Sequence, residues 1–185
     1  RRGLDALTRH DGFLTIGIRP VAADTGFGYI RPSGRQIAAG VFRARSFVEK
    51  PNLASARSMV RSGRYLWNSG IFAWRAGAFV EALRRCRPDV MRPLETWARG
   101  APRSGPWRVP TSVLRRVTRL PVDRALLEVS RDVLVMRASF TWSDVGTWRS
   151  LAALLPKDHV GNAGVGHLVS LDASNCVGVN EDGLT

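Results

Sequence analysis

The chain has 185 residues, of which 44% are hydrophobic and 23% are charged, a composition typical of a globular protein. It contains no apolar run of the roughly 20 residues that cross a membrane and no charged-then-apolar leader at its start, so we expect neither a membrane partner nor secretion. The formal net charge of +13 favours anionic ligands, but the basic residues are scattered rather than clustered, which argues against nucleic acid as a partner.

Strands alternate with helices along most of the chain. The run FLTIGIRP at residues 13–20, which ends in a proline, predicts a buried strand, and residues 4–10 before it resemble the end of a helix. A second strand ends at Val48, because Pro51 cannot donate to a ladder. Residues 53–62 predict a helix that ends at Gly63, with its arginines on a solvated face.

The second half of the chain continues the pattern. We expect an apolar strand at residues 65–74, an amphipathic helix at 76–90 and a loop rich in Pro and Gly at 99–112. A short helix at 122–130, a buried strand at 132–139 and a last helix at 148–155 are expected to follow. The alternation predicts an α/β fold. After Pro156 short strands and turn residues replace the helical pattern, so we place domains at residues 1–155 and 156–185, the second a β-rich tail.

The basic residues also differ in kind. Only two of the 28 basic residues are lysines, Lys50 and Lys157. A lysine within a motif therefore either marks a site that needs a compact charge or is an ordinary surface residue. The sequence alone favours neither. Cys86 and Cys176 have no metal-binding or disulfide spacing, and a reduced, cytoplasmic compartment is expected.

Polar residues near strand ends are the candidate site. Glu49 and Lys50 follow a strand, where open α/β sheets bind ligands. Asn68 lies inside an apolar strand, so its amide either bonds neighbouring backbone or binds a ligand hydroxyl. Gly28, in the turn TGFGY, allows close backbone approach, to a phosphate or a flat ring for example. Asp144 either caps the helix that follows it or binds Mg²⁺ together with substrate phosphates.

Taken in their order along the chain, these motifs resemble those of a known protein family. The segments TIGIRP, TGFGYI, FVEKPN, LWNSGIF, VDRALLE and WSDVGTW resemble, in sequence, those of the mannose-1-phosphate guanylyltransferases, which belong to the sugar-nucleotide pyrophosphorylases. The resemblance runs from about Leu4 to Leu155. It implies a Rossmann-like nucleotidyltransferase domain with a mixed sheet and flanking helices, followed by the start of a β-helix-like tail.

The resemblance also implies a reaction and its residues. The family transfers GMP from GTP to mannose 1-phosphate, giving GDP-mannose and pyrophosphate, with Mg²⁺ as cofactor. Glu49 and Asn68 would bind sugar hydroxyls, Lys50 the sugar phosphate, and Gly28 would line the sugar site. Asp144 would be the metal ligand, and Asp144 and Lys50 would be the catalytic residues. A homodimer is an expectation of the resemblance alone.

Departures from the family pattern leave alternatives. Phe27 stands where the family usually has tyrosine, and PVDR at residues 121–124 replaces a Ser-Ile-Asp-Tyr stretch, although Asp123 and Glu128 remain. The family's N-terminal Gly-rich nucleotide loop is not in this sequence, so we expect the 185 residues alone to be inactive. The alternatives are another hexose 1-phosphate as substrate, or a non-catalytic relative that binds sugar phosphate.

Overall fold

The computed structural model describes residues 2–10, 12–102, 104 and 107–180. The chain divides by compactness into two units, residues 1–140 and residues 141–185. The predicted domain boundary between residues 155 and 156 falls inside the second unit and stays a prediction. Among the described residues, no helix is long and apolar enough to cross a membrane.

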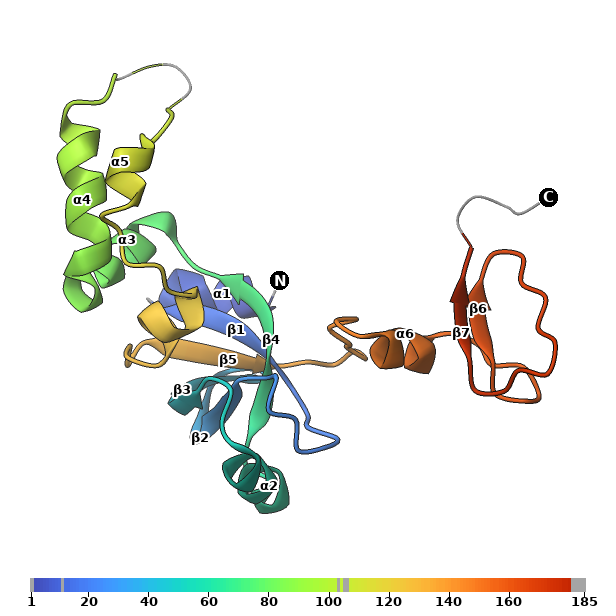
Figure 1. The fold of residues 1–185 in the computed structure, drawn as a ribbon. Helices are drawn as coiled ribbons and strands as arrows, with labels where there is room; N and C mark the ends of the chain where they lie inside the picture. The colour runs from blue at the N-terminus through green and yellow to red at the C-terminus, as the bar shows by residue number, and fades with distance from the viewer. Residues whose placement is uncertain (1, 11, 103, 105–106, 181–185) are drawn as a thin grey trace. The chain divides into compact units, whose positions relative to one another are not determined.

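A mixed sheet forms the centre of the first unit (Figure 1). Its described strands are β1 (Phe13–Ile18), β2 (Tyr29–Ala38), β3 (Val41–Val48), β4 (Leu66–Ala73) and β5 (Val133–Arg137). They lie in the order β1-β4-β2-β3-β5, and the sheet closes on itself because β5 pairs with both β1 and β3. The β1–β5 pair is parallel and the other pairs are antiparallel. The predicted α/β fold with a mixed sheet and flanking helices is confirmed.

Helices bury both faces of the central strands. The described helices of this unit are α1 (Arg2–Arg9), α2 (Leu53–Ser62), α3 (Ala76–Cys86), α4 (Pro88–Arg99), α5 (Thr111–Leu114) and the π-helix η1 (Asp123–Leu127). Phe13 belongs to a core cluster with residues of α3 and η1, whereas its neighbour Leu14 belongs to a second cluster with residues of α1. Successive strand residues point to opposite faces, so helix packing on both faces explains why every residue of β1 is buried.

The helix predicted over residues 76–90 is two helices. Here α3 ends at Cys86 and α4 begins at Pro88, with Arg87 between them in a non-helical conformation. Proline has no N–H to donate and is favoured at the first position of a helix, so Pro88 begins a new helix rather than extending the old one. The prediction of one continuous helix was wrong, and α4 was not predicted.

The predicted boundaries of α2 are confirmed. Asn52 caps its first turn, with Oδ1 accepting from the Ser55 N–H at 2.9 Å, and Gly63 ends it at a φ of 64°. The arginines of this segment, Arg57, Arg61 and Arg64, are exposed, as expected for a solvated face.

The second unit holds α6 (Trp148–Leu154) and two short strands, β6 (Ala163–Val165) and β7 (Val177–Val179). The strands pair in parallel, with Ala163 opposite Val177. A β-helix repeats this kind of pairing from coil to coil. Residues 181–185, the end of the predicted tail, lie outside the described residues.

Candidate functional site

Strand register brings three of the predicted site residues together. Tyr29, the first residue of β2, pairs with Val48 on one side and Trp67 on the other, both antiparallel. The residue before Tyr29 therefore meets the residues that follow Val48 and Trp67. Those residues are Gly28, Glu49 and Asn68, and the Asn68 N–H donates to the Gly28 carbonyl at 2.8 Å. With Lys50, Asp123 and Glu128 they are called here the Glu49 cluster.

Gly28 permits this close approach. A Cβ at position 28 would lie 2.6 Å from Glu49 Oε2, 3.1 Å from Phe47 Cζ and 3.3 Å from Asn68 Cβ. Gly28 is itself buried. A Cβ at this position would displace the Glu49 carboxylate, so glycine is what allows the carboxylate to lie here.

Asn68 is a buried amide with bonds at both ends. Its side chain is only 8% exposed. Oδ1 accepts from the Thr15 hydroxyl at 2.8 Å and from the Gly70 N–H at 3.3 Å, and Nδ2 donates to Asp123 Oδ1 at 2.9 Å. The alternative in which the Asn68 amide bonds neighbouring backbone therefore holds for only one of these partners, the Gly70 N–H. The other two partners are side chains far away in sequence.

Glu49 combines a fixed backbone with an unsatisfied side chain. Its N–H donates to Glu128 Oε1 at 2.8 Å, yet its own Oε2 is buried without a hydrogen-bond partner. Burial raises the pKa of the Glu49 carboxyl, and the charges of Asp123 and Glu128 raise the pKa further, whereas Lys50 and Arg124 lower it. A buried acceptor without a partner requires an explanation, and a ligand hydroxyl that donates to it is one.

Lys50 presents a free charge on a strained backbone. Its φ is 47°, in the left-handed region that non-glycine residues rarely adopt. The side chain is exposed and forms no ion pair or hydrogen bond with any residue that the structure describes. Strained backbone is concentrated at functional sites, so the strain is consistent with a ligand role for Lys50.

Asp144 lies in the second unit and is exposed. It does not cap α6, and neither does Ser143, because Thr147 is the N-cap and its hydroxyl accepts from the Ser150 N–H at 3.1 Å. The helix-cap interpretation of Asp144 was wrong. A Cβ at Gly146 would lie 2.7 Å from Asp144 Oδ2, so glycine leaves this carboxylate uncovered.

The donor set for a metal is incomplete within the described residues. These residues contain no group of three or more His, Cys, Asp or Glu side chains that could hold a metal ion. Mg²⁺ is commonly held by one or two carboxylates together with substrate phosphates. A single exposed carboxylate such as Asp144 fits that pattern as one ligand.

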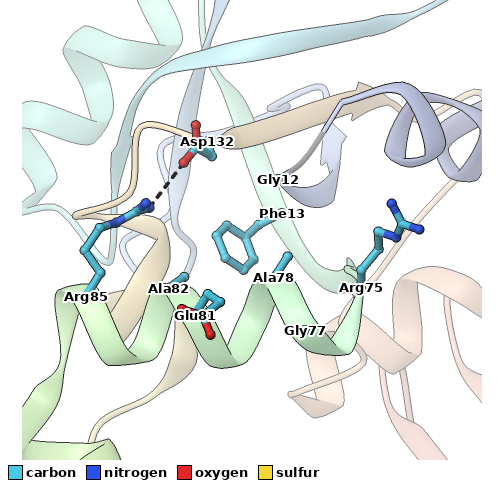
Figure 2. Close-up of a pocket in the computed structure, with 9 residues that line it drawn as sticks. All are labelled: Gly12, Phe13, Arg75, Gly77, Ala78, Glu81, Ala82, Arg85 and Asp132. Carbon is cyan, nitrogen blue, oxygen red and sulfur yellow. Dashed lines mark hydrogen bonds and ion pairs between the residues drawn. The ribbon is translucent and has the colours of Figure 1, made fainter.

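The cavity in Figure 2 does not overlap the Glu49 cluster. It has a volume of about 470 Å³ and lies between α3, the start of β1 and the residue before β5. Arg85 points toward Asp132 and pairs with it at 3.3 Å, while Glu81 pairs with Arg84. Most of the charged side chains that line this cavity thus form ion pairs within the protein, whereas Glu49 Oε2 has no hydrogen-bond partner among the described residues.

Sequence reasoning gave no role to three residues of this site. Asp123 and Glu128 were noticed only as remnants of a family stretch, and Thr15 was read as part of a buried strand. A signal existed for the two acids, since both flank the apolar residues of a short predicted helix. No local pattern showed that they contact Asn68 and Glu49.

Comparison with known proteins gives a consistent result. A family model described as Nucleotidyl transferase matches residues 5–160. The chain is 37% identical over 177 residues to a mannose-1-phosphate guanylyltransferase of Salmonella montevideo, covering 92% of this chain and 37% of that protein. It is 34% identical over 163 residues to the xanthan biosynthesis protein XanB of Xanthomonas campestris pv. campestris, covering 88% and 34%. The chain thus spans about a third of the length of these curated relatives.

Solved structures show the same relationship. A Thermus thermophilus structure named mannose-1-phosphate geranyltransferase matches with a TM-score of 0.80 and 31% identity, over 98% of this chain and 51% of that one. A Helicobacter pylori structure named mannose-6-phosphate isomerase shares the fold, with a TM-score of 0.65 at 24% identity.

Proposed function

Because this chain belongs to the nucleotidyl transferase family, we propose that it is the sugar-phosphate-binding part of a mannose-1-phosphate guanylyltransferase. The reaction would join GTP and mannose 1-phosphate to give GDP-mannose and pyrophosphate. A phosphate oxygen of mannose 1-phosphate attacks the α-phosphorus of GTP. A new P–O bond forms, and the bond from the α-phosphorus to the oxygen that bridges to the β-phosphorus breaks, releasing pyrophosphate.

One observation carries the sugar part of the proposal. The Oε2 of Glu49 is buried without a hydrogen-bond partner among the described residues, and it lies against Gly28, where an added Cβ would collide with it. A sugar hydroxyl is both donor and acceptor, so it can donate to this oxygen and accept from a neighbouring amide such as that of Asn68. Paired in this way, the Glu49 oxygen would no longer be unsatisfied.

Lys50 would supply the charge for the sugar phosphate. It is adjacent in sequence to Glu49, and its ammonium is exposed and unpaired among the described residues. A lysine offers a compact, rotatable charge that suits a phosphate oxygen. Holding the phosphate while Glu49 and Asn68 hold the ring would orient the attacking oxygen, which is the main way a protein accelerates phosphoryl transfer.

Asp144 would provide a carboxylate for Mg²⁺. Mg²⁺, when bound, neutralises negative charge on the reacting phosphates. Asp144 is free for this role because Thr147, not Asp144, caps α6. The cofactor, the nucleotide and the identity of the hexose are all parts of the proposal.

Isothermal calorimetry with mannose 1-phosphate and no nucleotide tests the sugar half. We expect saturable binding to the purified protein that is lost in Glu49→Ala and kept in Glu81→Ala, an exposed acid of α3 outside the cluster. Absence of binding to the wild-type protein would overturn the sugar-phosphate assignment. Galactose 1-phosphate and glucose 1-phosphate, run in parallel, test for another hexose.

Turnover of GTP with mannose 1-phosphate and Mg²⁺, measured on a full-length enzyme that contains these 185 residues, tests the reaction. We expect GDP-mannose and pyrophosphate in equal amounts, and less product with ATP, CTP or UTP. Binding of mannose 1-phosphate without turnover of any nucleotide would instead support the non-catalytic relative. Faster turnover with a different nucleotide would overturn the choice of GTP.

A further inference from the structure

One short element forms hydrogen bonds both to β4 and to the residue that follows β3. The π-helix η1 carries Asp123 at its start, and Glu128 follows its last residue. Asp123 Oδ1 accepts from Asn68 Nδ2 on β4 at 2.9 Å, and Glu128 Oε1 accepts from the Glu49 N–H after β3 at 2.8 Å. The Glu128 N–H donates to the Asp123 carbonyl at 3.0 Å, the i to i+5 bond that spaces the two acids.

The core holds η1 in place. Its residues Ala125, Leu126 and Leu127 are all 5% exposed or less and pack in the main core cluster. The two acids at its ends are therefore anchored by the apolar residues between them. Single π-helical turns occur often at functional sites, because the extra residue redirects side chains.

Asp123 determines which way the Asn68 amide points. An ionised carboxylate only accepts hydrogen bonds, so it requires the nitrogen of the amide to face it. The opposite end, Oδ1, accepts from Thr15 and Gly70. An amide nitrogen carries two hydrogens, and one of them is directed to Asp123. The other is left for a ligand acceptor.

We propose that Asp123 and Glu128 are positioning residues that fix Asn68 as a hydrogen-bond donor and Glu49 as an acceptor, so that together they bind one uncharged sugar hydroxyl. The hydroxyl donates to Glu49 Oε2 and accepts from Asn68 Nδ2. The side chains of Glu49 and Asn68 both adjoin Gly28, since Glu49 Oε2 and Asn68 Cβ lie 2.6 Å and 3.3 Å from the point where a Cβ of residue 28 would be. The proposal rests on the proposed sugar-phosphate function.

The charges around this point favour a neutral group. Three carboxylates, those of Glu49, Asp123 and Glu128, act on it together with the cations Lys50 and Arg124. An anionic ligand group here would add a like charge close to the acids. The structure thus separates a hydroxyl-binding end of the cluster from Lys50, the exposed cation proposed to hold the phosphate.

A double-mutant cycle tests the role of Asp123. Mannose 1-phosphate binding is measured by calorimetry for the wild type, Asp123→Ala, Asn68→Ala and the double variant. We expect Asp123→Ala to weaken binding about tenfold and Asn68→Ala at least as much. We expect the double variant to be no weaker than Asn68→Ala alone, because Asp123 acts through Asn68. If Asp123 had a merely structural role, the loss of affinity in the double variant would be the product of the losses in the two single variants.

Glu128 provides an independent test, in which a conservative variant is expected to restore binding. Its side chain is exposed, so Glu128→Ala should fold. We expect a threefold to tenfold weaker affinity in Glu128→Ala and near wild-type affinity in Glu128→Gln, whose side-chain oxygen can still accept from the Glu49 N–H. Glu81→Ala is the matched control and should bind like the wild type.

Deoxy analogues of mannose 1-phosphate identify the hydroxyl. In the wild type, one analogue should bind more weakly than mannose 1-phosphate, and in Asp123→Ala the same analogue should bind as well as mannose 1-phosphate does. If Asp123→Ala does not fold, Asp123→Asn replaces it in the cycle, with a loss of about threefold expected to vanish in the Asn68→Ala background.

The outcomes separate this inference from the proposed function. Wild-type binding together with an unchanged affinity in Asp123→Ala, or with a loss that persists in the Asn68→Ala background, overturns the positioning role and leaves the sugar-phosphate function standing. Equal losses in Glu128→Ala and Glu128→Gln overturn the role of Glu128. Failure of the wild type to bind mannose 1-phosphate overturns the proposed function and this inference together.

Discussion

The Glu49 cluster and the segment around Asp144 are supported in opposite ways. Glu49 and Asn68 are held by hydrogen bonds that they donate to Glu128 and Asp123, residues at least 55 positions away in sequence. Asp144 is exposed, and the hydrogen bonds of its neighbourhood, from Val145 to Ser143 and from Ser150 to Thr147, are local. The fold thus preorganises the proposed sugar site, whereas it leaves the proposed metal ligand uncovered.

This difference predicts opposite responses to mutation. Changes at Glu49, Asn68 or Asp123 should alter binding and stability together, because the same hydrogen bonds serve both. A change at Asp144 should alter turnover alone. The predictions below separate the two regions on that basis.

The largest effect is expected for Asp144→Asn. In the full-length enzyme, loss of a carboxylate ligand should reduce metal-dependent kcat by at least about 100-fold, since a metal ion contributes several kcal/mol to transition-state stabilisation. The Tm should not change, because no described bond of the fold uses the Asp144 side chain. Asp172→Asn, another exposed acid of the second unit, is the control. Normal turnover in Asp144→Asn would remove this residue from the metal site.

The next effect is expected for Lys50→Ala. Loss of a charged hydrogen bond should raise the KM for mannose 1-phosphate about 10- to 100-fold. Lys157→Ala changes the only other lysine and should leave KM unchanged. An unchanged KM in Lys50→Ala would mean that another residue binds the phosphate. In Lys50→Gly the same KM loss should come with higher stability, because glycine accepts the positive φ of residue 50 without strain.

A smaller effect is expected for Gly28→Ala. The added Cβ would lie 2.6 Å from Glu49 Oε2 and must push the carboxylate aside, so we expect about tenfold weaker binding of mannose 1-phosphate. Gly34→Ala, on the strand β2 that follows Gly28, is a matched control, since a Cβ there meets nothing within 4 Å. Equal affinity of both variants would show that the space beside Gly28 is not part of the sugar site.

The sequence predicted features that depend on near neighbours. Pro51 indicates that β3 has ended, and Gly63 marks the end of α2, because both act through the conformation of a few adjacent residues. The break between α3 and α4 was missed although Pro88 signals it. Family resemblance, rather than any single motif, indicates the residues of the proposed sugar site, since an amide within a strand also has an ordinary structural explanation.

The sequence could not predict how those residues meet. The contacts of Gly28 with Glu49 and Asn68 follow from the pairing of Tyr29 with Val48 and Trp67, and nothing local to those strands specifies their partners. The bond from Asn68 to Asp123 joins residues 55 positions apart. Register between distant strands depends on the packing of the whole core, which no short motif contains.

The smallest effect is expected for Glu49→Gln, as a gain in stability. Burial and the neighbouring acids raise the pKa of Glu49 in the folded protein above its ordinary value. The folded state then holds a proton that the unfolded state releases, so the wild type loses stability as the pH rises from the ordinary glutamate pKa through the raised one. Glutamine does not titrate and avoids this loss.

We therefore expect Glu49→Gln to match the wild type in Tm below about pH 4, near the ordinary glutamate pKa, and to exceed it by a few degrees at neutral pH. About 1 kcal/mol corresponds to roughly 2–4 °C in a chain of this size. Glu81→Gln, an exposed acid that pairs with Arg84, should show no such gain. A pH-independent difference for Glu49→Gln would mean that the pKa of Glu49 is the same in the folded and the unfolded protein, which would contradict the raised pKa. A gain in stability with lost mannose 1-phosphate binding would show that the fold keeps an unfavourable carboxylate for the sake of its ligand.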